Sequence, residues 1–261
     1  MIAWEKIYVH MPFFRLLSDP EKFCGFNVNC EIYFSSEALI SLNDRQIKNI
    51  NKLFDKGGIK RSIHAPFLDL NPAGNDNDVT QISLSRFKQC INACVKLKAN
   101  RMVMHTHYQP IFYDAHKQKW LANAAKCWQP LASYAGAKGV AIATENSIEQ
   151  SSWPALSLLK RVKGLKACFD VAHYNVFSPL GWEEELFKYP PRSVLEVHMS
   201  DNNGKSDEHL PLGEGNIDFK KFFNILRKRK MNPYITIEPH DDKGLVKGLR
   251  YIKKYCEDSK I

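Results

Sequence analysis

Short apolar segments of the kind that form β-strands recur along the whole chain. They are five to eight residues long, and most combine β-branched with other apolar residues. The eight segments are residues 6–10, 27–34, 59–65, 101–105, 139–145, 165–170, 193–198 and 233–238. The pattern therefore predicts eight strands.

Longer segments with the period of an amphipathic helix lie between most of these strands. They are residues 42–57, 78–99, 118–139, 151–164 and 218–230. Several of them close on glycine, where helices commonly end. This alternation predicts an α/β fold, a single (β/α)8 TIM barrel, with a doubly wound open sheet as the weaker alternative. No linker or low-complexity tract divides the chain, so we expect one domain over residues 1–261.

Side chains that commonly bind metals stand at the C-terminal ends of the predicted strands. The third to eighth strands end at His64, His105, Glu145, Asp170, His198 and Glu238, and His173 follows three residues after Asp170. A lone residue of this kind is more often solvated than a ligand. In a barrel, however, the carboxyl ends of all strands meet at one rim, where active sites are built. Six such residues at equivalent positions therefore predict one site.

The residue types in this set indicate which ion would bind. Imidazole and carboxylate together suit a divalent transition ion such as Zn, Mn or Co, whereas an all-oxygen set would suggest Mg or Ca. The segment 198–219, HMSDNNGKSDEHLPLGEGNIDF, adds further ligand types, although turn formers explain it equally well when it is taken alone. Seven cysteines without a CxxC pair are best explained as reduced, buried thiols.

Composition and charge limit the choice of partners. With 44% hydrophobic and 25% charged residues the chain is of ordinary globular composition, and it has no apolar run long enough to span a membrane. The first residues do not have the pattern of a signal peptide, so we expect a cytoplasmic protein without a membrane partner. The net charge of +9 suits sugar phosphates or nucleic acid, but its clearest concentration, RKRK at 227–230, is more often a solvated helix end. The sequence does not indicate an oligomeric state.

Seven short motifs follow one another through nearly the whole chain. They are IHAP at 63–66, MHTH at 104–107, TEN at 144–146, FDVAH at 169–173, VHMSD at 197–201, DEHLPLGEGNIDF at 207–219 and IEPH at 237–240. Each motif alone is weak, but the ordered set resembles the xylose isomerase-like TIM barrels. That family includes sugar isomerases and epimerases as well as the endonuclease IV nucleases, also called AP endonuclease family 2, which cleave DNA at abasic sites.

The resemblance implies roles for two sets of residues. The metal quartet shared by the epimerases corresponds to Glu145, Asp170, His198 and Glu238. The residues that would contact substrate or, as in the nuclease branch, bind additional metals are His64, His105, His173, Asp207 and His209. Three further residues, His10, Glu31 and Phe67, are candidates for substrate contact, although a solvated strand end or core packing would also explain them.

Two reactions are compatible with this set of ligands. In an isomerase or epimerase, one metal polarises a keto sugar while Glu145 and Glu238 shuttle the proton next to the carbonyl. In the nuclease, three metals held by nine ligands activate water for phosphodiester cleavage. The presence of all nine ligand types favours the nuclease.

Other features favour the sugar enzyme. THYQP follows His105 where the nucleases have HPG, ENSIEQ replaces their ENTAG loop, and Phe67 stands where they usually have tyrosine. The segment between His198 and Asp207 is also short for a loop that must reach into a DNA groove. We therefore expect a divalent-metal-dependent sugar or sugar-phosphate isomerase or epimerase of carbohydrate metabolism. The alternatives are a zinc-dependent endonuclease acting on abasic-site DNA and a metal-binding barrel that has lost activity.

Overall fold

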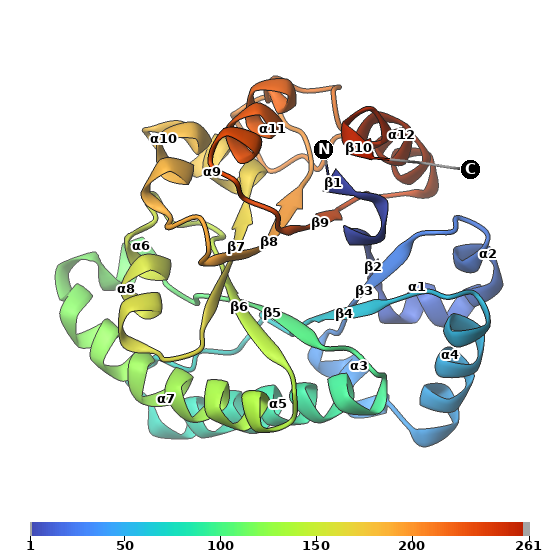
Figure 1. Ribbon diagram of the computed structural model, residues 1–261. Helices are drawn as coiled ribbons and strands as arrows, with labels where there is room; N and C mark the ends of the chain where they lie inside the picture. The colour runs from blue at the N-terminus through green and yellow to red at the C-terminus, as the bar shows by residue number, and fades with distance from the viewer. Residues whose placement is uncertain (1, 258–261) are drawn as a thin grey trace.

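The computed structural model describes residues 2–257 and contains a closed barrel of eight parallel strands (Figure 1). The barrel strands are β2 (Ile7–Pro12), β3 (Asn29–Tyr33), β4 (Arg61–His64), β5 (Arg101–His105), β6 (Ala141–Glu145), β7 (Lys166–Asp170), β8 (Val194–Met199) and β9 (Tyr234–Ile237). Each strand pairs in parallel with the next along the chain, and β9 pairs with β2 to close the ring. All eight predicted strands are present, which confirms the (β/α)8 fold.

Helices surround the barrel on its outer side (Figure 1). The longer ones are α4 (Asp44–Lys56), α5 (Asn77–Lys96), α7 (Lys117–Ala137), α8 (Trp153–Arg161), α10 (Gly181–Lys188), α11 (Phe219–Lys228) and α12 (Asp242–Ile252). The shorter ones are α1 (Phe13–Ser18), α2 (Pro20–Cys24), α3 (Ser36–Ser41), α6 (Pro110–Tyr113) and α9 (Val171–Phe177), with 3-10 turns η1 (Trp4–Lys6), η2 (Asp114–His116) and η3 (Lys253–Tyr255). The five predicted helices correspond to α4, α5, α7, α8 and α11. In the described part of the chain, none of the helices is both long and apolar enough to cross a membrane.

The sequence pattern missed the short helices and the pairing of the chain ends. Helices of four to eight residues contain too few turns to show a period, and α12 includes two glycines that weaken its pattern. The strands β1 (Ile2–Ala3) and β10 (Cys256–Glu257) pair in parallel outside the barrel and bring the two ends of the described chain together. That all 261 residues form one domain stays a prediction.

Local signals in the sequence explain where the predicted helices begin. At the start of α4, the Asn43 side chain accepts a hydrogen bond from the backbone N–H of Gln46, and the Gln46 side chain accepts one from the backbone N–H of Asn43. This capping box satisfies two N–H groups that have no partner within the helix. The carboxylate of Asp76 caps α5 in a similar way by accepting from Asp78 and Val79.

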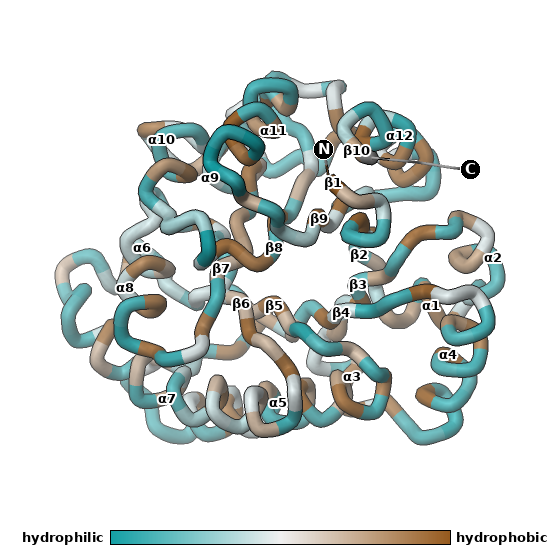
Figure 2. The backbone as a smooth tube through the Cα atoms, in the orientation of Figure 1, coloured by the Kyte–Doolittle hydropathy of each residue, from teal (hydrophilic) through white to brown (hydrophobic). Residues whose placement is uncertain are grey.

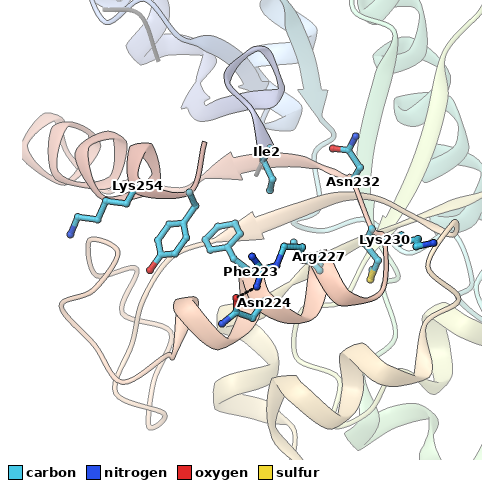
Figure 3. A pocket seen from close by; sticks show the side chains of 10 residues that line it. Ile2, Phe223, Asn224, Arg227, Lys230, Asn232 and Lys254 are labelled. Carbon is cyan, nitrogen blue, oxygen red and sulfur yellow. Dashed lines mark hydrogen bonds between the residues drawn. The ribbon is translucent and has the colours of Figure 1, made fainter. Parts of the chain in front are cut away.

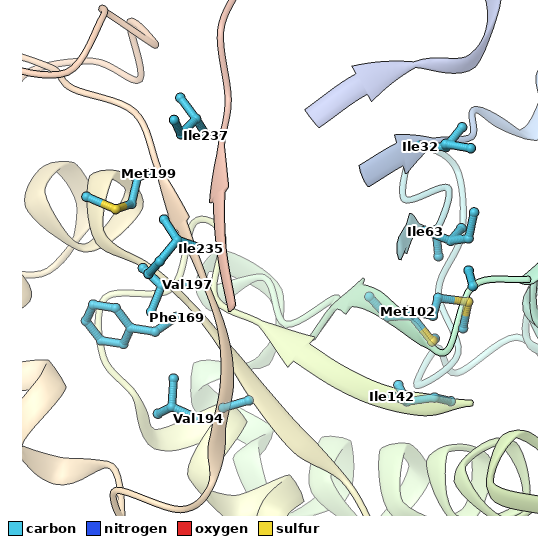
Figure 4. Packing of buried hydrophobic residues seen from close by; sticks show 14 of the residues in the cluster. Ile32, Ile63, Met102, Ile142, Phe169, Val194, Val197, Met199, Ile235 and Ile237 are labelled. Carbon is cyan, nitrogen blue, oxygen red and sulfur yellow. The ribbon is translucent and has the colours of Figure 1, made fainter. Parts of the chain in front are cut away.

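Alternation along each strand separates the hydrophobic core from the interior of the barrel. Residues such as Ile63 and Ile235 face outward and pack beneath the helices (Figure 4). Figure 2 shows hydrophobic residues recurring along the strands and hydrophilic residues on the outer turns of α4. The residues one position away point inward, where Val103, Ala143 and Cys168 form a small separate apolar cluster. The polar residues at the strand ends also point toward the interior of the barrel.

A buried ion pair fills the barrel at its N-terminal end. Arg101 on β5 donates from Nε to Oε2 of Glu196 on β8 (2.7 Å) and from Nη2 to Oε1 (3.2 Å). The guanidinium lies between the rings of Tyr8 and Tyr234, 3.9 and 3.8 Å from their centroids. Thr236 donates a further hydrogen bond to Glu196. This layer closes the barrel below the strand ends that carry the ligand-type residues.

We predict that Arg101→Met lowers the free energy of unfolding by about 3–5 kcal/mol, because it leaves the Glu196 carboxylate buried without its cation. Replacing both partners, as in Arg101→Met with Glu196→Leu, removes that unpaired charge and should recover much of the loss. Denaturant unfolding of the single and double variants tests this. Equal losses in both would show that the ion pair itself does not account for the cost.

Candidate functional site

The ligand-type residues predicted from the strand ends converge at the carboxyl-terminal mouth of the barrel. His10, Glu31, His64, His105, Glu145, Asp170 and His198 lie on β2 to β8 in that order, and Glu238 directly follows β9. His173 lies on α9, while Asp207 and His209 lie in the loop between β8 and α11. The alternation that buries the outer core thus turns an inward-facing residue at or near the end of each strand toward a common centre.

His198 occupies the middle of this group. Its Nδ1 lies 2.9 Å from Oε1 of Glu145 and 3.0 Å from Oε1 of Glu238. Its Nε2 lies 3.2 Å from Oε1 of Glu31. Neither ring nitrogen makes a well-directed hydrogen bond, although the imidazole is fully buried. Buried nitrogen and oxygen atoms that converge without forming well-directed hydrogen bonds fit a bound cation better than a hydrogen-bond network.

Asp170 supplies the fourth member of the predicted quartet. Its Oδ1 accepts a hydrogen bond from the backbone N–H of His173 (2.6 Å), which caps α9. Its Oδ2 is buried and has no hydrogen-bond partner. A buried carboxylate oxygen without a partner is costly unless a ligand satisfies it. This oxygen and the unsatisfied nitrogens of His198 are buried groups that a bound divalent metal ion would satisfy.

One flank of the centre is formed by His64 and His105 around Glu145. Oε2 of Glu145 lies 3.0 Å from Nε2 of His64 and 3.4 Å from Nε2 of His105. The Nδ1 of His64 is 2.9 Å from the carbonyl oxygen of Ala65, to which it donates. A histidine anchored through one nitrogen in this way presents the other in a fixed direction, as metal-binding histidines do. Glu145 therefore joins this flank to the centre through its two oxygens.

The opposite flank is formed by His173, Asp207 and His209. Oδ2 of Asp207 lies 3.3 Å from Nε2 of His173 and 3.1 Å from Nε2 of His209. Nδ1 of His173 donates to the carbonyl of Asn146 (2.9 Å). Each flank thus combines two imidazoles with a carboxylate, within a few ångström of one another.

The loop that carries Asp207 and His209 is held by a buried aspartate. The carboxylate of Asp201 accepts hydrogen bonds from the backbone N–H groups of Asn202, Gly213 and Ile217. Any side chain at residue 215 would collide with Asp201, which explains the glycine there. His209 itself has a left-handed backbone with φ of +48°, uncommon outside glycine. Some polar residues of segment 198–219 therefore build the loop, and others face the site.

His10 and Glu31 lie against the quartet. Nδ1 of His10 is 3.4 Å from Oε1 of Glu31 and 3.4 Å from Oε1 of Glu238. His10 lines the cavity above the site, whereas Glu31 is fully buried and does not. The predicted substrate contact is therefore compatible with the position of His10. Glu31 instead supports His10 and His198 from below.

Burial and mutual attraction shift the pKa values of this cluster in opposite directions. Burial alone would raise the pKa of Glu145 and of Glu238. Neighbouring imidazoles, His198 above all, instead lower the pKa of Glu145 well below its usual range and the pKa of Glu238 to about 2. Burial would lower the pKa of His198, yet Cys168 and the surrounding carboxylates hold it well above the usual range. Burial raises the pKa of Asp170 to about 7. Without a metal, protons on imidazoles therefore balance the carboxylates.

A cavity of about 370 Å³ opens above the cluster. Phe67 forms one wall, and its ring stacks on His105 (centroids 4.4 Å apart) and on Tyr33 (5.5 Å). Arg15 lines the cavity too, but its guanidinium is held by Asp242 and the backbone carbonyl of His240. Sequence reasoning missed Tyr33 and Arg15. Tyr33 could have been predicted, because it lies two residues after Glu31 on the same strand and therefore also faces the interior of the barrel.

A second hollow, of about 330 Å³, lies at the opposite, N-terminal face of the barrel (Figure 3). Its described lining includes Phe223, Arg227, Lys230 and Lys254. None of the described residues around it is acidic or a histidine. It therefore lacks the residue types of the mouth, and the predicted ligand-type residues gather at the carboxyl-terminal end.

Comparisons with known proteins confirm the expected family. The model of the xylose isomerase-like TIM barrel family matches residues 26–255. An uncharacterized protein of Methanocaldococcus jannaschii, MJ1311, is 28% identical over 225 residues, which cover 83% of this chain and 76% of that protein. A solved D-tagatose 3-epimerase-like protein is 27% identical with a TM-score of 0.84, covering 95% of this chain and 96% of its own.

Two more distant structures share the fold. The TTHB071 protein from Thermus thermophilus, soaked with ZnCl2, has a TM-score of 0.78 at 22% identity and covers 96% of this chain and 97% of its own. D-psicose 3-epimerase from Clostridium cellulolyticum, solved with D-tagatose, has a TM-score of 0.80 at 15% identity and covers 97% of this chain and 99% of its own. Since the family model spans most of the sequence, the chain belongs to the xylose isomerase-like TIM barrel family.

Proposed function

We propose that the protein is a divalent-metal-dependent isomerase or epimerase that abstracts a proton next to the carbonyl of a small sugar or sugar phosphate. The observation that carries the proposal is the convergence of Glu145 and Glu238 on one nitrogen of His198, with both carboxylates lining the cavity. The similarity to a D-tagatose 3-epimerase-like protein supports it. A cytoplasmic location and a role in carbohydrate metabolism belong to the same proposal.

Glu145, Asp170, His198 and Glu238 would hold the ion, for which zinc, manganese and cobalt suit the donor types. When bound, such an ion polarises a carbonyl and its neighbouring hydroxyl and so acidifies the C–H bond between them. All four side chains are buried, so little of their surface is exposed to bulk water.

The two carboxylates are placed to act from different sides of a bound sugar. Glu145 ends β6 and Glu238 follows β9, three strand positions further around the ring. Each has an imidazole behind it: Nε2 of His64 lies 3.0 Å from Oε2 of Glu145, and Nδ1 of His209 lies 3.7 Å from Oε2 of Glu238. One carboxylate would take a proton from one face of the substrate, and the other, which must hold a proton beforehand, would give that proton to the opposite face.

A second function is favoured by one specific observation. The two flanking clusters, His64 with His105 and Glu145, and His173 with Asp207 and His209, are each compact enough to hold an ion of their own. A site with three ions is the arrangement expected for phosphodiester hydrolysis at abasic sites in DNA. The endonuclease therefore remains the alternative to be tested.

We predict that Glu145→Ala and Asp170→Ala each abolish metal binding and leave the fold intact. Outer-shell partners already change metal affinity by about 10–100-fold, so loss of a ligand should weaken it further. Elemental analysis after dialysis gives the metal content, and circular dichroism monitors the fold. Glu208→Ala is a matched control, because its carboxylate lies in the same loop as Asp207 but bonds to Asn203. Full occupancy in the quartet variants would contradict the assignment.

We predict that metal binding releases protons and weakens as the pH falls. In the metal-free protein, Asp170 is protonated below its pKa of about 7, and the raised pKa of His198 keeps that imidazole charged at neutral pH. Both must lose their protons to bind an ion, so affinity should rise with pH through 7 and above, instead of levelling off near the ordinary imidazole value of about 6.5. Calorimetry in buffers of different ionisation enthalpy measures the protons released. Affinity that is constant between pH 6 and 8 would contradict the prediction.

We predict that the metal-loaded protein incorporates deuterium next to the carbonyl of its substrate in heavy water, because a carboxylic acid exchanges its proton with solvent. A panel of ketoses and ketose phosphates, followed by nuclear magnetic resonance, tests this.

Under the same proposal His209→Ala should raise the Michaelis constant and leave one ion per chain in place. The isomerase proposal would be contradicted, and the endonuclease supported, by three results together: three ions per chain, no exchange with any sugar, and nicking of abasic-site DNA.

A further inference from the structure

A second compartment adjoins the candidate metal centre. It has a volume of about 440 Å³ and shares Phe67, His105 and Ser147 with the cavity above the metal centre. We call this compartment the side chamber. Its other walls come from the loops after β4, β5 and β6, namely Leu68 to Asn71, His107 to Gln109, and Ile148 with Glu149. Both compartments fall within the range of about 300–1,000 Å³ found for ligand pockets.

The side chamber offers polar groups without positive charge. Among the described residues that line it there is no lysine or arginine, whereas Asp69 and Glu149 are acidic. Nε2 of His107 is buried and has no hydrogen-bond partner. An anionic group such as a phosphate would find no cation here, while sugar hydroxyls can donate to carboxylates and bond to an imidazole.

The backbone of the side chamber is held in an uncommon conformation at two points. Asp69 and His107 have φ of +60° and +58°, the left-handed region that residues other than glycine seldom adopt. Such conformations concentrate at ligand-binding sites, where the surrounding structure enforces them. The third wall is fixed as well, because the buried Glu149 carboxylate accepts hydrogen bonds from the Thr106 hydroxyl and the Ser147 backbone N–H.

Apolar residues edge the opening. Leu68 is 65% exposed and Ile148 is 43% exposed, and they come from two different loops of the lining. Apolar side chains left in solvent at the edge of a concave polar surface are a feature of binding sites. A sugar ring presents both kinds of surface, with C–H groups on its faces and hydroxyls around its edge.

We propose that the side chamber is a subsite for an uncharged glycosyl group, so that the substrate is a sugar carrying a second, neutral ring and not a free or phosphorylated monosaccharide. The proposal deepens the isomerase or epimerase function and rests on it. The ring that reacts would lie over Glu145 and Glu238, and the second ring would extend past Phe67 into the side chamber.

Equilibrium binding to the metal-loaded protein tests the proposal without requiring turnover. The probes are D-fructose, fructose 6-phosphate and a set of glucosyl-fructoses with different linkages, measured by calorimetry. We expect at least one glucosyl-fructose to bind about tenfold or more tightly than D-fructose, and the phosphate to gain nothing. Equal binding of the disaccharides and D-fructose, tightest binding of the phosphate, or no binding of any probe would each overturn the proposal.

A pair of variants tests whether the tighter binding of a disaccharide depends on the side chamber. Ile148→Trp places a bulky ring at the opening of the side chamber, and the affinity ratio of disaccharide to D-fructose should fall to about one. Leu180→Trp is the matched control, because Leu180 is similarly exposed at 48% and lines neither compartment, so the ratio should persist. A ratio that survives Ile148→Trp would refute the subsite.

Deuterium exchange separates this proposal from the proposed function. Suppose that a disaccharide binds more tightly than D-fructose and that Ile148→Trp removes the difference, but that no sugar incorporates deuterium. The subsite would then be supported and the isomerase reaction would not. If free ketoses exchange as fast as every disaccharide and bind as tightly, the reaction stands and the subsite does not.

Discussion

The site depends on the need to balance buried negative charge inside a closed barrel. Carboxylates at the mouth, Glu31, Glu145 and Glu238, are nearly or completely removed from water around one imidazole. An isolated buried carboxylate is strongly unfavourable, so each needs a positive partner. At the opposite end of the barrel the permanently charged Arg101 neutralises Glu196. At the mouth the compensating charge is exchangeable: protons on imidazoles in the metal-free protein, and an ion in the proposed enzyme.

The same alternation that buries the core determines how much of the site could be predicted. A strand that closes a barrel must turn every second residue inward, so the phase of the apolar residues also gives the phase of His105 and Glu145. Arg101 obeys this rule too, yet a basic residue at the start of a strand is also typical of a solvated position. Its burial follows from partners on β2, β8 and β9, which only the closed ring brings together.

Residues outside the strands could not be placed by periodicity. Asp207 and His209 lie in a segment that the sequence analysis noted for its ligand-type residues, but only the family resemblance gave them a role in the site. Their position depends on hydrogen bonds from three backbone N–H groups to Asp201, two of which come from Gly213 and Ile217 further along the chain, and on the left-handed backbone of His209. Asp170 shows a related difficulty, because one side chain ends a strand, caps α9 and presents a second oxygen to the centre. The short helix that follows it was therefore missed, although its N-cap residue was identified.

The distribution of positive charge bears on the choice between the two candidate reactions. Binding of DNA draws most of its affinity from lysine and arginine contacts to phosphates. Among the described residues that line the two compartments at the mouth, Arg15 is the only such side chain, and it is paired with Asp242. The basic segment 227–230 contributes instead to the hollow at the N-terminal face, where Figure 3 shows Arg227 and Lys230. A net charge of +9 therefore does not by itself favour DNA, because the part of it seen here would not guide a phosphate backbone to the metal centre.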